Sequence, residues 1–451
     1  MNLTSKPKAR VLDMTTGKPL GLILRFAVPL FIGNIFQQVY SMVDTMVVGY
    51  HLGDSAIAAI GATAALYTLM INFANGLNIG YGIVVTQCFG AQDRKKMKQA
   101  IAGMMVLDGA ASLILTTAML LLLKPLMAFM NTPEGIFQQS CTYISVIVAG
   151  MAATLSYNMF AAILRAMGNS RSPLYFLIAS SLLNVGLDLL FVAALGWGIA
   201  GAAAATVLAQ TISAVTCGIY TFRNYREYLP EKEDFRVSGE TLKILWSTGI
   251  AVAMMSCLVE IGSVIFQREN NLLGENIIAA FTAARKLLVI MIQPQATIAV
   301  ATSTFIGQNW GAGKTGRIRL GLKRAVLLEL AWGFTAAAII FLFGGSLVRL
   351  TTGTSDSDVI ANAVLSLRIN FAMFPILGVL FCIRNALQAM GKKLVPVLSS
   401  CIELAMKLLA ALVLIPKLGF LGTCITEPIT WGLMTGFLMW FYLTRVKLPE
   451  E

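Results

Sequence analysis

Residues 99–123 read QAIAGMMVLDGAASLILTTAMLLLL, 25 consecutive residues of which Asp108 is the only charged one. As a helix this run is about 37 Å long, more than the roughly 30 Å hydrocarbon core of a bilayer. Membrane β-strands need only about ten residues and alternate between apolar and polar side chains. The run therefore predicts a transmembrane helix, and with its neighbours it predicts an all-α integral membrane protein.

The same pattern recurs along the whole chain. Of the 451 residues, 57% are hydrophobic and 12% are charged, about half of the roughly 25% charged residues that soluble domains carry. A soluble, fibrous, disordered or disulfide-stapled protein is therefore excluded. Twelve apolar segments are predicted to span the membrane: 21–50, 56–88, 99–123, 136–163, 173–195, 199–222, 242–267, 277–304, 322–343, 359–387, 395–416 and 420–443. Proline and glycine inside these segments, among them Pro375, Gly76 and Gly80, are predicted to kink their helices.

Positive charge lies mainly on one side of the predicted spans. With the N-terminus placed in the cytoplasm, 26 of the 34 Lys and Arg residues fall on the cytoplasmic side and four fall outside. This is the positive-inside pattern, so the net charge of +12 does not indicate nucleic-acid binding. The N-terminal stretch also lacks the apolar core of a signal peptide. We predict a multi-pass protein of the plasma (inner) membrane with both termini in the cytoplasm.

The longest polar connector divides the chain into two halves of six predicted helices each. We predict an N-lobe at 1–222, a cytoplasmic linker at 223–241 and a C-lobe at 242–451. Because six is an even number, both halves insert the same way up and form two parallel six-helix repeats. Two parallel lobes are typical of an alternating-access carrier, although duplication can also simply build a larger bundle.

Short matches between the halves support the duplication. Gly90-Ala91 recurs as Gly311-Ala312, which is an offset of 221 in the numbering. Ala166-Met167-Gly168 recurs as Ala389-Met390-Gly391, which is an offset of 223. The two offsets are close enough to describe one repeat with a small insertion.

Ionisable side chains inside apolar helices point to function, because each costs about 2.5–3.5 kcal/mol to insert. Asp44, Asn184 and Asp188 lie in apolar helices with no basic residue nearby in sequence. Asn184 and Asp188 are four residues apart and share one helix face. Two carboxylates and an amide could bind a small cation such as Na+ through oxygen, or they could exchange a proton. Alternatively, each Asp caps a kinked backbone or hydrogen-bonds a neighbouring helix.

Other charges in the predicted helices have both a functional and a structural interpretation. Glu260 could attract a cationic substrate or carry a proton, or it could be a protonated acid bonded to a nearby hydroxyl. Glu403 and Lys407, four residues apart, are predicted to form an internal ion pair. The acids Asp108 and Glu329 are duplicated at the offset of 221, which favours a structural role in both halves.

The two halves differ at the positions of these groups. By the repeat offsets, Asn184 of the first half corresponds to Lys407 of the second, and Thr206 corresponds to Glu427. A cation site that includes Asn184 would therefore belong to the N-lobe alone.

Enzyme chemistry is not indicated, and we predict no enzyme and no cofactor. The single histidine, His51, has no clustered partner, and the seven cysteines form no CxxC pair. The 22 methionines and 24 phenylalanines could line a cavity for flat hydrophobic compounds, although such residues more often form core. The candidate lining residues of such a substrate cavity are Glu260, Met255, Met291 and Tyr40.

Six short motifs, taken together and in order, resemble those of the multidrug and toxic compound extrusion (MATE) family. They are Pro29 followed by Val43-Asp44, Gly90-Ala91-Gln92-Asp93, Arg165-Ala166-Met167-Gly168-Asn169, Leu183-Asn184 to Asp188, Gly307-Gln308-Asn309-Trp310-Gly311-Ala312, and Glu427-Pro428-Ile429-Thr430-Trp431. The resemblance implies a MATE-like fold of twelve helices. It also implies a monomeric secondary antiporter that exports amphipathic or cationic drugs and toxic compounds in exchange for Na+ or H+.

The resemblance further implies where the coupling ion binds. The implied cation-coupling site lies in the N-lobe and consists of Asp44, Asn184, Asp188 and Thr206, supported by Gln37. Glu260 matches a seventh-helix acid of some branches of the family. The tenth-helix acid of one branch is missing here, so the C-lobe cation site of that branch is not expected.

Two other classes of protein stay open at this point. A flippase for a lipid-linked saccharide or another lipid, from the same wider superfamily, would need a more basic cavity to hold pyrophosphate. A membrane-embedded enzyme would need a cluster of catalytic groups at one depth, and the sequence shows none. The expected partners are small-molecule drugs, toxic organic cations and membrane lipid.

Overall fold

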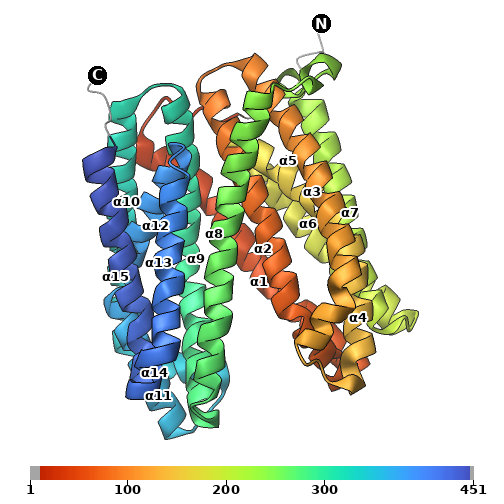
Figure 1. Ribbon diagram of the computed structural model, residues 1–451, viewed down its shortest axis with the longest axis vertical. Coiled ribbons are helices and arrows are strands. Elements are labelled where there is room, and N and C mark those ends of the chain that lie inside the picture. The colour runs from red at the N-terminus through yellow and green to blue at the C-terminus, as the bar shows by residue number, and fades with distance from the viewer. Residues whose placement is uncertain (1–10, 447–451) are drawn as a thin grey trace, which may run out of the picture. The chain divides into compact units, whose positions relative to one another are not determined.

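The computed structural model describes residues 11–446, and within that range the chain is helical and has no β-strand (Figure 1). Nine helices there are long and apolar enough to cross a membrane, and two further spans are bent helix pairs. α15 (Phe420–Arg445) adds a less apolar helix of 26 residues, which is long enough to span as well. The predicted all-α membrane fold is confirmed. Four bases of the charge count, Lys6, Lys8, Arg10 and Lys447, lie outside the described residues.

The nine single-piece spans follow the predicted segments. They are α1 (Pro19–Leu52), α2 (Asp54–Gly90), α3 (Arg94–Phe129), α6 with η1 (Arg171–Ala194), α7 (Gly198–Asn224), α8 (Gly239–Asn271), α9 (Glu275–Gly311), α10 (Thr315–Thr352) and α13 with η4 and α14 (Leu394–Leu418). Their lengths run from 24 to 38 residues, whereas about 20 residues are enough to cross a bilayer. The excess length indicates helices that tilt or extend beyond the hydrocarbon core.

Two spans are broken at equivalent places in the two repeats. α4 (Glu134–Ala149) and α5 (Met151–Ala166) meet at an angle of 45°, and α11 (Ser357–Ala372) and α12 (Phe374–Ala389) meet at 49°. The first residues of α4 and α11 stand at the repeat offset of 223. Pro375 in the first turn of α12 explains the second break, because proline lacks the N–H that would continue the preceding helix. The predicted kink at Pro375 is therefore confirmed.

A π-helical turn also recurs in both repeats. η1 (Leu189–Ala194) follows α6 (Arg171–Asp188) directly, and η4 (Ala410–Leu414) follows α13 (Leu394–Leu409) directly. The first residues of the two turns stand at the repeat offset of 221. Such turns insert an extra residue into a helix and often mark functional sites. They therefore single out Asp188 and its neighbours in the first repeat, and the end of α13 in the second.

The described helices form two compact units. Among the described residues, unit 1 contains 11–13 and Pro29–Ala253, and unit 2 contains Met14–Val28 and 254–446. The predicted lobes, 1–222 and 242–451, differ from these units in two places. The leading segment, Met14–Val28, lies in unit 2, whereas the connector and the first part of α8 lie in unit 1.

The start of the leading segment is hydrogen-bonded to the end of α9 and the start of α10. Met14 is fully buried, and its backbone N–H donates to Gln308 Oε1 at 2.8 Å. Its carbonyl accepts from Asn309 Nδ2 and from Arg317 Nη2, both at 3.1 Å. Arg317 also donates to Gly17 O at 3.0 Å and, through Nε, to Asn309 Oδ1 at 3.0 Å. The Gly307–Ala312 motif thus provides side chains that fasten a distant part of the chain to unit 2.

Asn309→Ala is expected to loosen the leading segment. The change removes a fully buried amide that bonds both Met14 O and Arg317, and leaving such groups unpaired costs about 1–3 kcal/mol. Limited proteolysis should then cleave the chain near Met14 faster than in the parent, and the unfolding temperature should fall. Lys323→Ala on the exposed side of α10 is the matched control and should change neither. Equal proteolysis in both variants would contradict the role of Asn309.

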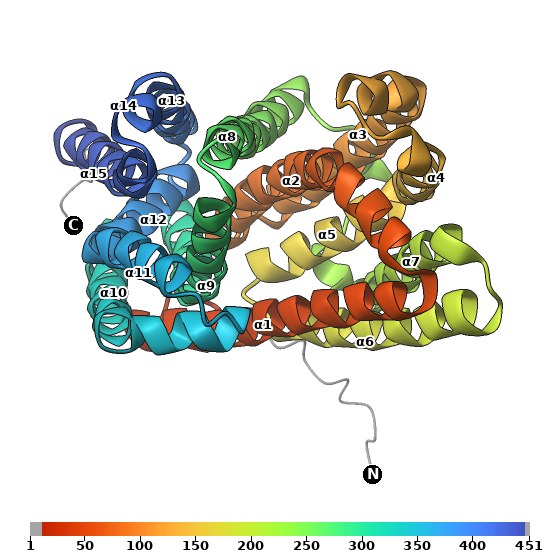
Figure 2. The ribbon, with the colours of Figure 1, turned by 90° about the horizontal axis from the view of Figure 1, so that it is seen from below.

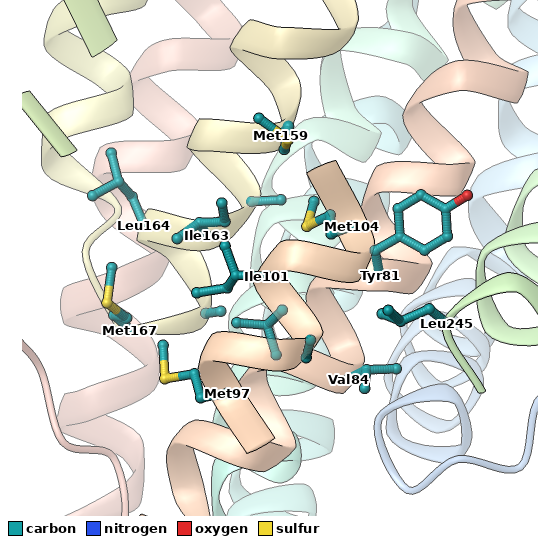
Figure 3. Close-up of a cluster of buried hydrophobic side chains, with 14 of the residues drawn as sticks. Tyr81, Val84, Met97, Ile101, Met104, Met159, Ile163, Leu164, Met167 and Leu245 are labelled. Carbon is teal, nitrogen blue, oxygen red and sulfur yellow. The ribbon is translucent and has the colours of Figure 1, made fainter. Parts of the chain in front are cut away.

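The core of unit 1 is built from α2, α3 and α5, which pack on one another, and α5 also packs on α7. Figure 3 shows side chains from these helices around Ile101, with Tyr81 and Leu245 on one side of the cluster. Four methionines, Met97, Met104, Met159 and Met167, belong to this cluster and are at most 7% exposed. These four are core residues and do not line a substrate cavity.

α2 and α8 approach each other closely within unit 1 because glycines lie at their crossing. A Cβ on Gly76 would lie 2.5 Å from Ala253 Cα, and a Cβ on Gly80 would lie 2.5 Å from Gly249 Cα. Small residues at such crossings let two backbones pack directly, as is common in membrane helices. α2 continues without a break through Gly76 and Gly80, and the kink that the sequence predicted at these glycines stays a prediction.

The polar connector is also packed against unit 1. Tyr225, which follows α7, is fully buried, and its hydroxyl accepts from Asn169 Nδ2 at 2.7 Å. Two short 3₁₀ turns follow, η2 (Arg226–Tyr228) and η3 (Lys232–Phe235), and Glu231 between them pairs with Lys98 of α3 at 2.7 Å. The connector is thus part of the unit 1 fold.

In unit 2, α9, α10, α11 and α12 lie side by side, and α15 packs on α11, α12 and α13 (Figure 2). A break between α11 and α12 brings Phe371 and Phe374 into a stack with ring centroids 4.5 Å apart. α13 and α15 then carry charged side chains into this unit, where they meet residues of α8, α9 and α12.

Candidate functional site

Two pairs of polar side chains face each other in unit 1. Tyr40 and Asp44 lie four residues apart on α1, and Asn184 and Asp188 lie four residues apart on α6. That spacing places both members of each pair on the same face of their helix. Asn184 is 3% exposed and Asp188 is fully buried. The structure therefore brings together three of the predicted coupling residues, Asp44, Asn184 and Asp188.

A chain of hydrogen bonds connects the two helices. The Tyr40 hydroxyl donates to Asn184 Oδ1, and Asn184 Nδ2 donates to Asp188 Oδ2 at 2.9 Å. The carboxyl of Asp44 lies close enough to that of Asp188 for the two groups to interact directly. Asp188 Oδ1 is buried, and no N–H or hydroxyl group donates to it. A buried carboxyl that is only partly hydrogen-bonded thus has a second acid beside it.

Two tyrosines complete the surroundings of the acids. Tyr67 of α2 lies close enough to Asp44 to interact with it, and Tyr143 of α4 lies close enough to interact with Asp44 and Asp188. Sequence reasoning missed both, because they lie far from α1 and α6 along the chain and have no local signature. It placed Tyr40 in the substrate cavity, whereas the structure bonds Tyr40 to Asn184.

The remaining predicted coupling residues lie outside this hydrogen-bonded set. Thr206 of α7 is half-buried, and its hydroxyl donates to Ala202 O at 3.1 Å. Gln37, about two turns before Asp44 on α1, is exposed. The arrangement of Asp44, Asn184 and Asp188 does not depend on either side chain.

The oxygen ligands that these side chains offer in unit 1 suit a small hard cation or a proton. Carboxylate, amide and phenol oxygens are the ligands that Na+ and similar cations take, and a buried acid with a free oxygen needs a cation or a proton beside it. Two carboxyl groups in contact can also share a single proton. The residues present therefore fit a small cation or a proton, which Asp44 and Asp188 would hold.

The candidate lining residues of the substrate cavity lie in different surroundings. Glu260, Met255 and Met291 are half-buried residues of unit 2. Met255 Sδ accepts from Gln388 Nε2 at 3.2 Å, and the Met291 carbonyl accepts from Trp332 Nε1 at 3.0 Å. Glu260 lies near Arg285 of α9 and influences it electrostatically. Tyr40 belongs to unit 1.

Unit 2 contains charged groups of both signs where unit 1 contains acids. Lys407 Nζ donates to Glu403 Oε1 at 2.9 Å, which confirms the predicted ion pair, and also to Ser263 Oγ at 2.9 Å. Arg384 approaches the other oxygen of Glu403 at 3.7 Å. Arg285 Nη1 pairs with Glu427 Oε1 at 2.7 Å, a partner that the sequence did not indicate.

The duplicated acids Asp108 and Glu329 are buried in equivalent places of their units. Asp108 is 4% exposed and accepts from Asn78 Nδ2 at 3.2 Å, while Glu329 is fully buried below Gly378. A Cβ on Gly378 would lie 2.8 Å from Glu329 Cβ. The close packing of Glu329 against Gly378 and the hydrogen bond of Asp108 to Asn78 support the predicted structural role.

Comparison with known proteins places this architecture in a family. The MatE family model matches twice, at residues 29–190 and 251–413. The starting positions of the two matches differ by an amount that lies between the two offsets of the sequence motifs. This chain belongs to the MatE family. The resemblance inferred from its motifs is thereby confirmed, as is the internal duplication.

Several curated relatives match most of the chain. A probable multidrug resistance protein of Bacillus subtilis, YpnP, is 26% identical over 85% of both chains. A probable multidrug resistance protein NorM of Thermotoga maritima is 24% identical, covering 89% of this chain and 88% of its own. The multidrug export protein MepA of Staphylococcus aureus is 22% identical, covering 82% of this chain and 81% of its own.

Solved structures share the fold. An outward-facing multidrug resistance MATE family transporter of the MOP superfamily aligns with a TM-score of 0.89 and 21% identity, covering 99% of this chain and all of its own. A MATE protein in a bent conformation aligns with a TM-score of 0.90 and 22% identity, covering 97% of this chain and 98% of its own. With its long apolar helices and its match to the MatE model, this chain is a multi-pass membrane protein.

Proposed function

We propose that this protein is a secondary antiporter that exports amphipathic, often cationic, compounds in exchange for Na+ or H+. The observation that carries the proposal is the site in unit 1, where the carboxyl groups of Asp44 and Asp188 interact directly and Asp188 is fully buried. The names of the relatives, which are multidrug resistance and export proteins, support the class of substrate.

The proposed mechanism follows from linkage between two ligands. Charge compensation at Asp44 and Asp188 changes what the two side chains can bond to, and so favours one conformation of α1. A substrate that prefers the other conformation is then released when the ion binds. Energy passes from the ion gradient to the substrate because each ligand lowers the affinity for the other.

The test is transport in sealed vesicles with Na+ and pH gradients imposed separately. The proposal expects uptake of a lipophilic cation, such as an ethidium-type dye, to be driven by one of the two gradients and to collapse when that gradient is dissipated. The same vesicles are assayed for translocation of a fluorescent lipid-linked saccharide. Flipping of that lipid without gradient-driven dye transport would overturn the proposal in favour of a flippase.

Glu260→Gln is expected to weaken export of cationic compounds by several-fold while changing export of neutral compounds little. The carboxylate is half-buried in a helix of unit 2 and would attract positive charge over a short distance in a medium of low dielectric. Initial export rates for a cationic and a neutral compound of similar size provide the measurement. An equal loss for both would assign Glu260 to coupling or folding instead.

A further inference from the structure

The second repeat has kept the framework of the unit 1 ion site and changed its chemistry. The π-helical turn after Asp188 has its counterpart after Leu409, and Asn184 corresponds to Lys407 at the offset of 223. Asn184 Nδ2 bonds the acid Asp188 at 2.9 Å, and Lys407 Nζ bonds the acid Glu403 at 2.9 Å. An amide that bonds an acid in unit 1 is thus replaced by an ammonium that bonds an acid in unit 2.

Arg285 supplies a second fixed positive charge in the same part of unit 2. Its guanidinium bonds Glu427 at 2.7 Å and also interacts with Glu403 and Glu260. Glu427 lies on α15, at the position that corresponds to Thr206 of the first repeat. Three acids therefore gather around Arg285 and Lys407, and these five side chains come from α8, α9, α13 and α15.

A small cavity adjoins the Arg285–Glu427 pair. Its volume is about 20 Å³, enough for one water molecule or one bare monovalent cation. Beside the ion pair it is lined by Asn370, Thr423 and Ser366, with Phe266 and Phe281 on its apolar side. Asn370 is 8% exposed, and its Oδ1 is buried and accepts no hydrogen bond. The cavity thus offers carboxylate, amide and hydroxyl oxygens to whatever occupies it.

We propose that Arg285 is a built-in substitute for a coupling cation, so that unit 2 contains a cation site which the protein itself keeps filled. The guanidinium satisfies Glu427 permanently, and Lys407 does the same for Glu403. A fixed charge cannot be exchanged across the membrane. Coupling to the ion gradient therefore uses the site of unit 1 alone. This inference rests on the antiport proposed above and adds to it.

The substitute charge has a specific consequence for variants. Removing the guanidinium leaves Glu427, whose side chain is only 15% exposed, without its ion-pair partner, and Asn370 Oδ1 and Thr423 Oγ1 lie beside the enlarged cavity. A buried carboxylate without a partner takes up a cation or a proton. Arg285→Gln should therefore convert unit 2 into a site that responds to Na+ or to H+.

The experiment measures cation binding by unit 2 in a protein whose unit 1 site has lost both of its acids. Purified protein with Asp44→Asn and Asp188→Asn serves as the background, and its unfolding temperature is followed against Na+, balanced with choline, and separately against pH. The background should not respond to Na+. Adding Arg285→Gln or Arg285→Ala should produce a saturable rise of roughly 2–4 °C with Na+, or the same rise toward acid pH. The first result identifies a metal cation as the occupant and the second a proton.

Two matched variants decide the assignment. Arg285→Lys keeps a fixed charge and should leave the background insensitive to both ions. Combining Arg285→Gln with Glu427→Gln removes the carboxylate and should abolish the new response. A variant that is recovered folded only with Na+ or at acid pH also supports the proposal.

The proposal would be overturned if the unfolding temperature and yield of the Arg285→Gln protein did not change with Na+ or with pH. It would also be overturned if the background protein already responded to Na+. Failure of the antiport itself is distinguished by the parent protein. If the parent and the background respond identically to Na+ and pH, the ion site of unit 1 is wrong whatever unit 2 does.

Discussion

Asp44→Asn should reduce gradient-driven export by more than roughly tenfold while the protein still folds and binds substrate. The amide keeps the shape of the side chain but can neither carry the exchanged proton nor neutralise a cation. Without that charge, the contact between Asp44 and Asp188 no longer changes with the ion gradient. Substrate export in vesicles and substrate binding in detergent, measured on the same preparation, provide the comparison.

The control is an acid that lies outside the site. Asp54 is exposed at the start of α2, and Asp54→Asn should export at the parental rate. Asn184→Ala should give an intermediate loss, because it removes the amide that bonds Asp188 but no titratable group. Normal export by Asp44→Asn would disprove the site in unit 1 and make Glu260 the leading candidate.

Gly80→Ala should strongly destabilise unit 1. The new Cβ would lie 2.5 Å from Gly249 Cα and 2.6 Å from Thr248 O. Both are backbone atoms, so no change of rotamer relieves the clash and α2 must move away from α8. Overpacking of this kind costs about 1–3 kcal/mol and sometimes more. The unfolding temperature and the yield of monodisperse protein provide the measurement.

Gly109→Ala on α3 provides the matched control for this prediction. Nothing lies within 4 Å of the position its Cβ would take, and alanine favours a helix over glycine by about 1 kcal/mol. Stability should stay the same or rise slightly. If Gly80→Ala behaved like Gly109→Ala, the close crossing of α2 and α8 would be incorrect.

Much of the fold could be predicted from sequence because membrane helices have a local signature. A membrane-spanning run such as 99–123 has to be almost entirely apolar, so its position can be predicted from composition alone. α3 contains the whole run. The internal duplication could likewise be recognised from single residues, because glycines and acids that pack in the same way in both halves are retained at the repeat offset.

Part of the candidate site could be predicted for the same reason. Asn184 and Asp188 lie on one helix face by their spacing, and Asp44 stands out as a lone acid in an apolar run. Tyr67 and Tyr143 could not be found, because their approach to Asp44 depends on how α2 and α4 pack. Tyrosine in an apolar helix is not unusual enough to attract attention.

The contacts that could not be predicted from the sequence are mainly those between residues far apart in the chain. Arg285 and Glu427 are 142 positions apart, and no local pattern indicates which of several acids an arginine in an apolar helix will meet. The attachment of Met14 to Asn309 spans 295 positions and depends on backbone atoms, which carry no sequence signature. The Gly307–Ala312 motif was recognised, but what it holds became apparent only in the fold.

The assignment of residues to the two units describes a reciprocal exchange. Met14–Val28 begins the first repeat but belongs to unit 2. By the offset of 221, its counterpart in the second repeat is 235–249, which belongs to unit 1. Each repeat thus gives its opening segment to the other unit, as the subunits of a domain-swapped homodimer do. Fusing two copies of such a gene would leave this pattern, and cutting the chain in its connector would yield two fragments that each lack a piece of their own core.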